Sequence, residues 1–214
     1  MGSAMELESR HQCLIYDGPP SVHLRAVAAI TREKLGQNYR CLYLNSEPMV
    51  AGMKSYLAAA GVDVARVIDK TSLVLSSEQG HLTGGRFDVD RMLSSLEDAF
   101  DQARNDGYSG LWATGDMTWE LGPEKDFSRL LDYEWRLEEF FRTHLQMGGI
   151  CQYHADTLPP EAVRQGLLAH RSLFVNQTLS LMNPYYVHPR CFTHAAARNP
   201  ELEPVVMRLC QMET

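Results

Sequence analysis

The chain has 214 residues, a formal net charge of −7 at pH 7 and a 44% share of hydrophobic residues. This length predicts one large domain or two small ones, and we favour one because no stretch has the composition of a linker. The acidic balance argues against a nucleic-acid surface, which needs clustered Lys and Arg, and against binding to an anionic membrane. No apolar run reaches the ~18 residues that a membrane-spanning helix requires.

The N-terminal segment and the cysteines indicate the compartment. Residues 1–10 are expected to be disordered and to include a remnant of an expression vector, and they contain no apolar signal core. An odd number of cysteines without a secretion signal suits a reducing environment, so we predict a cytoplasmic protein in which all of them are reduced. They are Cys13, Cys41, Cys151, Cys191 and Cys210.

Short apolar runs alternate with longer amphipathic segments along the chain. The runs predict buried strands at 13–16, 41–44, 72–75, 111–114 and 150–153, and two shorter strands near 173–175 and 185–187. The amphipathic segments predict helices at 21–35, 48–60, 92–103, 127–145 and 159–169. This order indicates an α/β fold of three layers, with a mostly parallel central sheet and helices on both faces. The pair Gly84-Gly85 predicts a turn.

Loops at the carboxyl ends of parallel strands converge at one edge of a sheet, where ligands bind in open α/β folds. We predict a cavity there that is lined by Trp119, with Asp116 and His154 within reach of it and Glu134 entering from the long helix. The candidate ligand-binding residues are Asp17, Ser21, Asp116, Trp119, Glu134, Tyr153 and His154.

Three of these candidates also have simple structural interpretations. Asp116 stands beside Gly115, where an aspartate commonly caps a turn. Trp119 is either a surface on which a ligand stacks or a plug over the core. Glu134 lies near the apolar stripe of its helix, so it is either a buried carboxylate with a partner or a rim residue that reaches water.

The first loop argues against a phosphate-binding function. It reads Asp17-Gly18-Pro19-Pro20-Ser21, so it has no lysine, its two prolines lack N–H donors, and its aspartate repels phosphate. We therefore predict neither tight nucleotide binding nor ATP hydrolysis. The rival interpretation is a nucleotide hydrolase with an unusual loop, in which Asp116 and Glu78 supply the acidic groups.

Metal ligands and catalytic motifs are weakly represented. Cys151 and His154 have the spacing of half a metal site, but regular strand alternation places them on opposite faces. A second half-site is spaced by three over His188, Cys191 and His194. The pair His170-Arg171 is interpreted as cations at a helix C-terminus. With no nucleophile, zinc-protease or dinucleotide motif present, we predict neither an enzyme nor a metal or other cofactor.

Several short segments of the chain match one known family in their order and spacing. They are residues 11–16, 40–43, 107–110, 115–119, 133–134, 151–154, His170 and 183–186, and they span about residues 11–190. Taken together, they resemble the MEDS domain, a sensory module named for methanogen and methylotroph proteins and a dichloromethane-responsive regulator. Two departures concern the pair His170-Arg171, where His-Pro is expected, and Glu138, where the pattern after Tyr133-Glu134 has an asparagine.

This resemblance implies a sensory domain over residues 11–190 with a RecA-like, P-loop-like fold and a degenerate phosphate loop. It also implies a bacterial or archaeal signalling protein that senses a small organic molecule, proposed to be a hydrocarbon derivative, and controls a histidine kinase or a DNA-binding output domain. Residues 191–214 are then an extension towards a partner or output domain, and the stripe Val205, Val206, Leu209 and Met212 suggests self-association as a homodimer. A pure interaction module with a vestigial pocket is the remaining alternative.

Overall fold

The computed structural model describes residues 10–176, 178–193 and 198–211. A seven-stranded sheet in the order β3-β2-β6-β7-β1-β8-β9 forms its centre. Neighbouring strands pair in parallel, except that β9 runs antiparallel to β8. The strands are β1 (His11–Tyr16), β2 (Tyr39–Leu44), β3 (Leu73–Ser76), β6 (Gly110–Asp116), β7 (Met147–His154), β8 (Ser172–Asn176) and β9 (Leu179–Met182).

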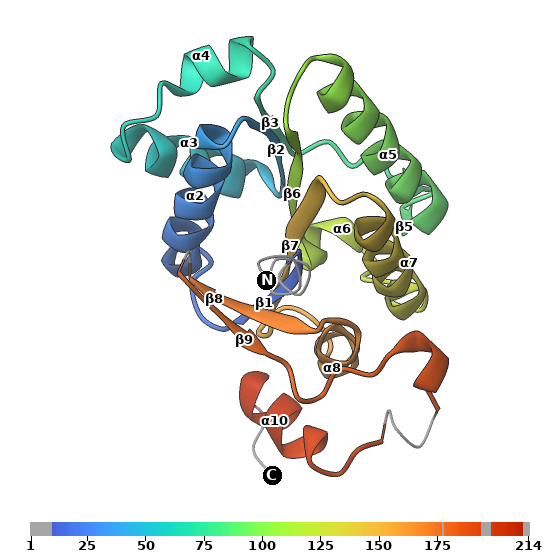
Figure 1. Cartoon of the computed structure of the whole chain (residues 1–214). Helices are drawn as coiled ribbons and strands as arrows, with labels where there is room; N and C mark the ends of the chain where they lie inside the picture. The colour runs from blue at the N-terminus through green and yellow to red at the C-terminus, as the bar shows by residue number, and fades with distance from the viewer. Residues whose placement is uncertain (1–9, 177, 194–197, 212–214) are drawn as a thin grey trace.

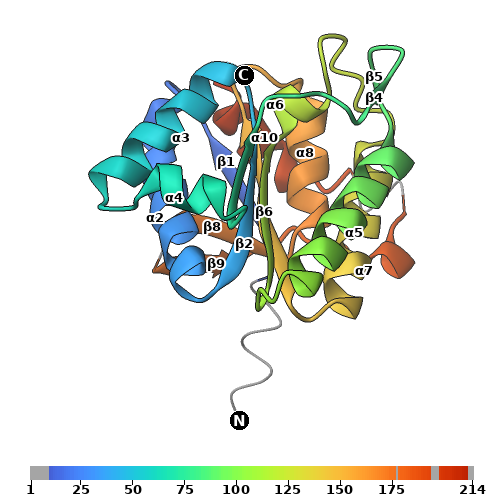
Figure 2. The same cartoon turned by 90° about the horizontal axis from the view of Figure 1, so that it is seen from above.

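Helices cover both faces of this sheet, which gives the three layers that the sequence predicts (Figures 1 and 2). One face carries α2 (Ser21–Gly36), α3 (Glu47–Ala59) and α4 (Val64–Asp69). The opposite face carries α5 (Val89–Asn105), α6 (Met117–Glu120), α7 (Leu130–Thr143) and α8 (Pro160–Ala169). Each face has its own apolar core, so the sheet is buried on both sides.

The alternation of side chains along the central strands decides which core each residue joins. In β1, Cys13 packs towards α5 and α7, whereas Leu14 packs towards α2 and α3. The same holds in β7 for Cys151 and Ile150. Two residues that follow one another in a central strand therefore belong to the cores on opposite sides of the sheet.

The predicted pattern of elements is largely confirmed, with local corrections. The strand predicted near 185–187 is wrong, because the chain instead adds the edge strand β9, which begins six residues earlier in the sequence. The helix predicted from residue 127 begins at Leu130. The short α4 and α6 were not predicted, nor was the hairpin of β4 (Leu82–Thr83) and β5 (Arg86–Phe87). Its turn at Gly84-Gly85 is confirmed, and both glycines have positive φ.

The C-terminal segment returns to the domain. A 3-10 turn, η1 (Pro189–Cys191), precedes α10 (Leu202–Leu209), which packs against α8. Leu202 and Val206 are buried there against Leu167 and Leu168. Met212 of the expected stripe, residues 1–9 and His194 lie outside the described residues. Among the described residues, no helix is long and apolar enough to cross a membrane.

Candidate functional site

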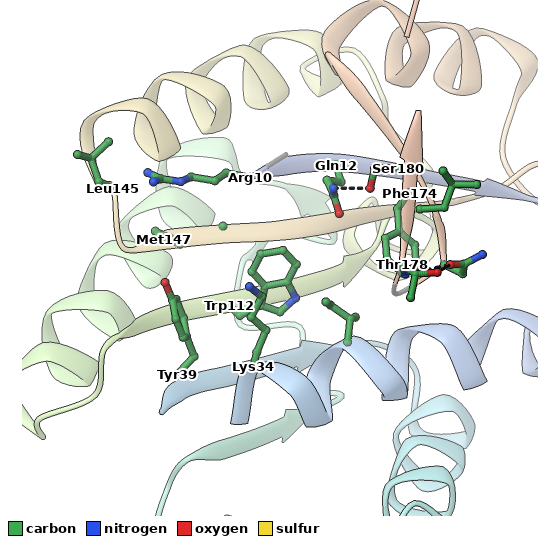
Figure 3. A pocket seen from close by; sticks show the side chains of 14 residues that line it. Arg10, Gln12, Lys34, Tyr39, Trp112, Leu145, Met147, Phe174, Thr178 and Ser180 are labelled. Carbon is green, nitrogen blue, oxygen red and sulfur yellow. Dashed lines mark hydrogen bonds between the residues drawn. The ribbon is translucent and has the colours of Figure 1, made fainter. Parts of the chain in front are cut away.

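A cavity of about 350 Å³ lies on the α2 side of the sheet, near the amino ends of β1, β2, β6 and β7 (Figure 3). We call it the amino-end cavity. Tyr39, Trp112 and Phe174 contribute aromatic rings to its wall, and polar groups form the larger part of the lining. Its lining residues include Arg10, Gln12, Ile30, Lys34, Tyr39, Trp112, Met147, Phe174, Leu179 and Ser180.

Several polar groups of this cavity are held in place or left without a partner. Gln12 donates a hydrogen bond to Ser180 Oγ at 2.7 Å, and Lys34 Nζ lies 4.7 Å from the centroid of the Trp112 ring. Trp112 Nε1 and Arg10 Nη1 are buried donors without a hydrogen-bond partner among the described residues. A cavity that combines aromatic rings with unused donors is suited to a small molecule that carries an acceptor or a negative charge.

The carboxyl ends of the strands bring together Asp116, Tyr16 and His154. The Tyr16 hydroxyl donates to Asp116 Oδ2 at 3.1 Å, and His154 stacks on the Tyr16 ring with centroids 4.8 Å apart. Burial raises the pKa of Asp116, although hydrogen bonds from Trp119 and Tyr16 oppose the shift. Asp116 also accepts from the Trp119 backbone N–H at 3.2 Å, so it caps α6 as well as contacting Tyr16.

Trp119 is buried between α6 and the segment that precedes α5. Its side chain is 8% exposed, its Nε1 donates to the backbone oxygen of Ser77 at 3.3 Å, and its ring lies 4.8 Å from that of His81. These contacts hold the segment between β3 and α5 against α6. Asp17 and Ser21 are exposed, and Asp17 accepts a hydrogen bond from Gln211.

The predicted residues Glu134 and Tyr153 lie on the face of the sheet that α7 and α8 cover, in a buried polar cluster with His11, Cys151 and His170. Glu134 Oε2 is 3.1 Å from His11 Nε2 and 3.5 Å from both Cys151 Sγ and His170 Nε2. The Tyr153 hydroxyl donates to the other carboxylate oxygen, Oε1. Glu134 is thus a fully buried carboxylate with partners, and the rim interpretation is wrong.

The charges of this cluster are set by burial and by close neighbours. Burial disfavours the imidazolium of His11, but Glu134 and Glu138 on either side outweigh it and raise its pKa to about 9. Burial and the charge on His11 lower the pKa of His170 to about 4. Burial alone would raise the pKa of Glu134, yet the adjacent imidazoles and hydrogen bonds lower it. Burial and the charge of Glu134 raise the pKa of the Cys151 thiol.

Glu120 is a second buried carboxyl group. A cavity of about 20 Å³, roughly the room that one water molecule needs, adjoins it near Tyr133. Its Oε2 has no hydrogen-bond partner in the described parts of the chain. Burial, followed by the charges of Glu134 and Asp116, raises the pKa of Glu120 well above its usual value. The shift favours the neutral form of the carboxyl group over the carboxylate.

The seven predicted site residues thus divide between the two faces and one edge of the sheet. Cys151 and His154 point to opposite faces, as strand alternation predicts, so they form no common half-site. His170 stands at the end of α8, as predicted, but the prediction of a cation there is wrong, because burial and the charge on His11 lower its pKa to about 4. Sequence reasoning missed Arg10 and Trp112 of the amino-end cavity and His11 of the cluster, although His11 and Trp112 stand in the predicted strands or directly beside them.

Comparison with known proteins identifies the family. A family model described as the methanogen/methylotroph, DcmR sensory domain, MEDS, matches residues 10–171. The chain belongs to the MEDS family. A search of curated proteins finds no match to this chain. The resemblance of its short segments to MEDS is therefore confirmed, and membership in this family supports a role as a sensory input domain.

Proposed function

We propose that this MEDS domain senses a small organic molecule in the amino-end cavity and passes the signal to an output domain of the same protein. The observation that carries the proposal is the cavity itself, which combines the rings of Trp112, Tyr39 and Phe174 with buried donors that have no partner among the described residues. Its volume of about 350 Å³ lies within the usual range for small-molecule sites. A hydrocarbon derivative with a polar head group fits this chemistry.

The head group that suits the cavity best is a carboxylate or another anion. Arg10 and Lys34 both line the cavity, and Lys34 is already held over the Trp112 ring. An Arg guanidinium with an unused buried nitrogen pairs readily with a carboxylate. We propose that the apolar body of the ligand packs on the aromatic wall while its head group meets Arg10.

We further propose a binding function without catalysis on a RecA-like fold. The fold proposal is supported by the place of β1 between β7 and β8, with the first loop leading directly into α2. The same loop argues against nucleotide hydrolysis, since the Gly18 N–H donates to Asp156 Oδ2 at 2.8 Å instead of being open to phosphate. A histidine kinase or a DNA-binding domain is the output that we propose.

Thermal unfolding with matched probe molecules tests the ligand proposal. Benzoate and benzyl alcohol share one ring and differ in the head group, so benzoate should raise the Tm more at equal concentration. Arg10→Gln should remove most of this difference. Arg25→Gln is the matched control, because it removes the same charge from an exposed position on α2. Equal Tm values with either probe and without probe would contradict the proposal for this class of ligand.

A further inference from the structure

Four buried side chains from different parts of the chain meet between the sheet and helices α7 and α8. His11 begins β1, Cys151 lies in β7, Glu134 lies on α7 and His170 follows α8. Each offers one ligand atom, and all four atoms lie within 4.8 Å of one another. We propose that this quartet is a binding site for a divalent transition-metal ion of the zinc class.

Four of the six distances among the ligand atoms of the quartet are close to those around a tetrahedral ion. Ligand bonds of about 2.0–2.3 Å separate the N, O and S atoms around tetrahedral zinc by about 3.3–3.7 Å. His11 Nε2 lies 3.1 Å from Glu134 Oε2 and 3.6 Å from Cys151 Sγ. Glu134 Oε2 lies 3.5 Å from both Cys151 Sγ and His170 Nε2. The remaining pairs of ligand atoms lie within 4.8 Å, and binding of the ion would draw all four atoms to its bond lengths.

His170 supplies an independent reason to place a cation here. Its Nδ1 lies 2.8 Å from the backbone oxygen of Gly166, which can only accept, so Nδ1 carries the proton and Nε2 presents a lone pair. That lone pair faces Glu134 Oε2, and Nε2 has no hydrogen-bond partner among the residues that the structure describes. A buried lone pair opposite a carboxylate needs an electron-pair acceptor between them, and a metal ion satisfies both groups.

The surrounding residues orient the proposed ligands. His11 Nδ1 lies 3.0 Å from Glu138 Oε2, so its other nitrogen, Nε2, faces the quartet. The Tyr153 hydroxyl holds Glu134 through Oε1 and leaves Oε2 for the ion. Metal-binding histidines are usually fixed in this way by a carboxylate or a backbone carbonyl on the far ring nitrogen. Both histidines of the quartet have such a partner.

Binding of the ion leaves the net charge of the quartet unchanged, because two protons leave when a doubly charged cation enters. Cys151 releases its thiol proton, His11 releases the proton on Nε2, and an ion with two positive charges takes their place. Four protein ligands complete a tetrahedral shell, and all four residues are buried. This closed arrangement is typical of a structural or sensory metal, since catalytic zinc keeps a position open for water or substrate.

The quartet faces α7, whereas the amino-end cavity lies on the α2 side of the sheet, so the two proposals can fail separately. The test is a Co²⁺ titration of the metal-free full chain under reducing, oxygen-free conditions. The expected result is one equivalent bound, with the visible bands of four-coordinate cobalt and a near-ultraviolet thiolate-to-cobalt band. Zn²⁺ should displace the cobalt and raise the Tm of the wild-type chain.

Two pairs of variants decide between a specific and an incidental site. Cys151→Ser should abolish the thiolate-to-cobalt band, whereas Cys13→Ser should keep it. Cys13 is the matched control because it is buried on the same face and lies opposite Cys151 in the paired strands. Glu138→Gln should weaken cobalt binding about 10–100-fold and retain the bands, as for other positioning partners of ligands. Glu139→Gln, at the exposed neighbouring position, should leave the affinity unchanged.

The same measurements can overturn the proposal. Absence of a thiolate-to-cobalt band in the wild-type chain would show that the quartet is a buried ion pair of His11 and Glu134 alone. A band that survives Cys151→Ser and disappears in Cys13→Ser would place the metal elsewhere. If Cys151→Ser does not fold, the comparison of Glu138→Gln with Glu139→Gln decides, and equal affinities for both contradict the site.

Discussion

Replacing Trp119 tests whether its ring closes the core or forms a surface on which a ligand stacks. A ring that closes the core contributes more to the free energy of unfolding than a ring that only contacts a ligand. An indole buries roughly 150–250 Å², which at about 25 cal/mol per Å² gives an upper bound of roughly 4–6 kcal/mol for a side chain that is 8% exposed. Alanine keeps a little of this area and the segment before α5 can relax, so Trp119→Ala should lower the free energy of unfolding by about 3–5 kcal/mol.

Guanidinium unfolding followed by far-ultraviolet circular dichroism measures this loss. Trp119→Phe keeps a ring but loses the hydrogen bond to the Ser77 oxygen, so it should cost only about 1–2 kcal/mol. Trp135→Ala is a control of the same chemistry, since Trp135 is only half-buried and packs edge-on against Phe192. A Trp119→Ala chain within about 1 kcal/mol of wild type would refute the plug interpretation and return Trp119 to the candidate ligand surface.

Two further predictions concern buried groups. Burial raises the pKa of Glu120 in the folded chain, so in the unfolded chain this carboxyl group loses its proton at a lower pH. Its contribution to the free energy of unfolding therefore falls as the pH rises above about 4.5. Glu120→Gln should therefore stabilise the chain more at about pH 8 than at about pH 5, and a difference independent of pH in urea unfolding would contradict this. Deletion of residues 198–214 removes Leu202 and Val206 from their contacts with α8, so we expect a lower Tm, and an unchanged Tm would show that α10 is dispensable.

The elements that the sequence predicts well are those with a strong hydrophobic period. The central strands read as continuous apolar runs because both of their faces are buried, and α5 repeats buried residues at helical spacing from Val89 to Ala103. The edge strand β9 was missed for the opposite reason. All four of its residues are exposed, so their hydrophobic pattern does not indicate a strand that pairs with β8.

Features of the candidate sites that depend on neighbouring residues could be predicted from the sequence, whereas those that depend on contacts between distant segments could not. Strand alternation is local, and it separates Cys151 from His154 in the structure as it does in the sequence. The quartet needs the register in which His11 pairs with Gly149, two residues before Cys151, and no local pattern specifies that register. His170 carried a misleading local signal, because a histidine at a helix end is ordinarily an exposed cation.

Small residues on the α7 side of the sheet explain how a polar layer fits inside an apolar core. A methyl group at Gly115 would overlap the carboxyl group of Glu120, and one at Gly166 would come within 2.8 Å of the Tyr153 ring. The chain thus leaves out side chains beside Glu120 and beside Tyr153, whose hydroxyl donates to Glu134. Buried carboxylates lower the free energy of unfolding unless they are paired or neutral. Apolar side chains of the same volume would give a more stable core. A core that departs from apolar packing in this way is the expected location of a function, which is why the quartet and Glu120 are the first positions to test.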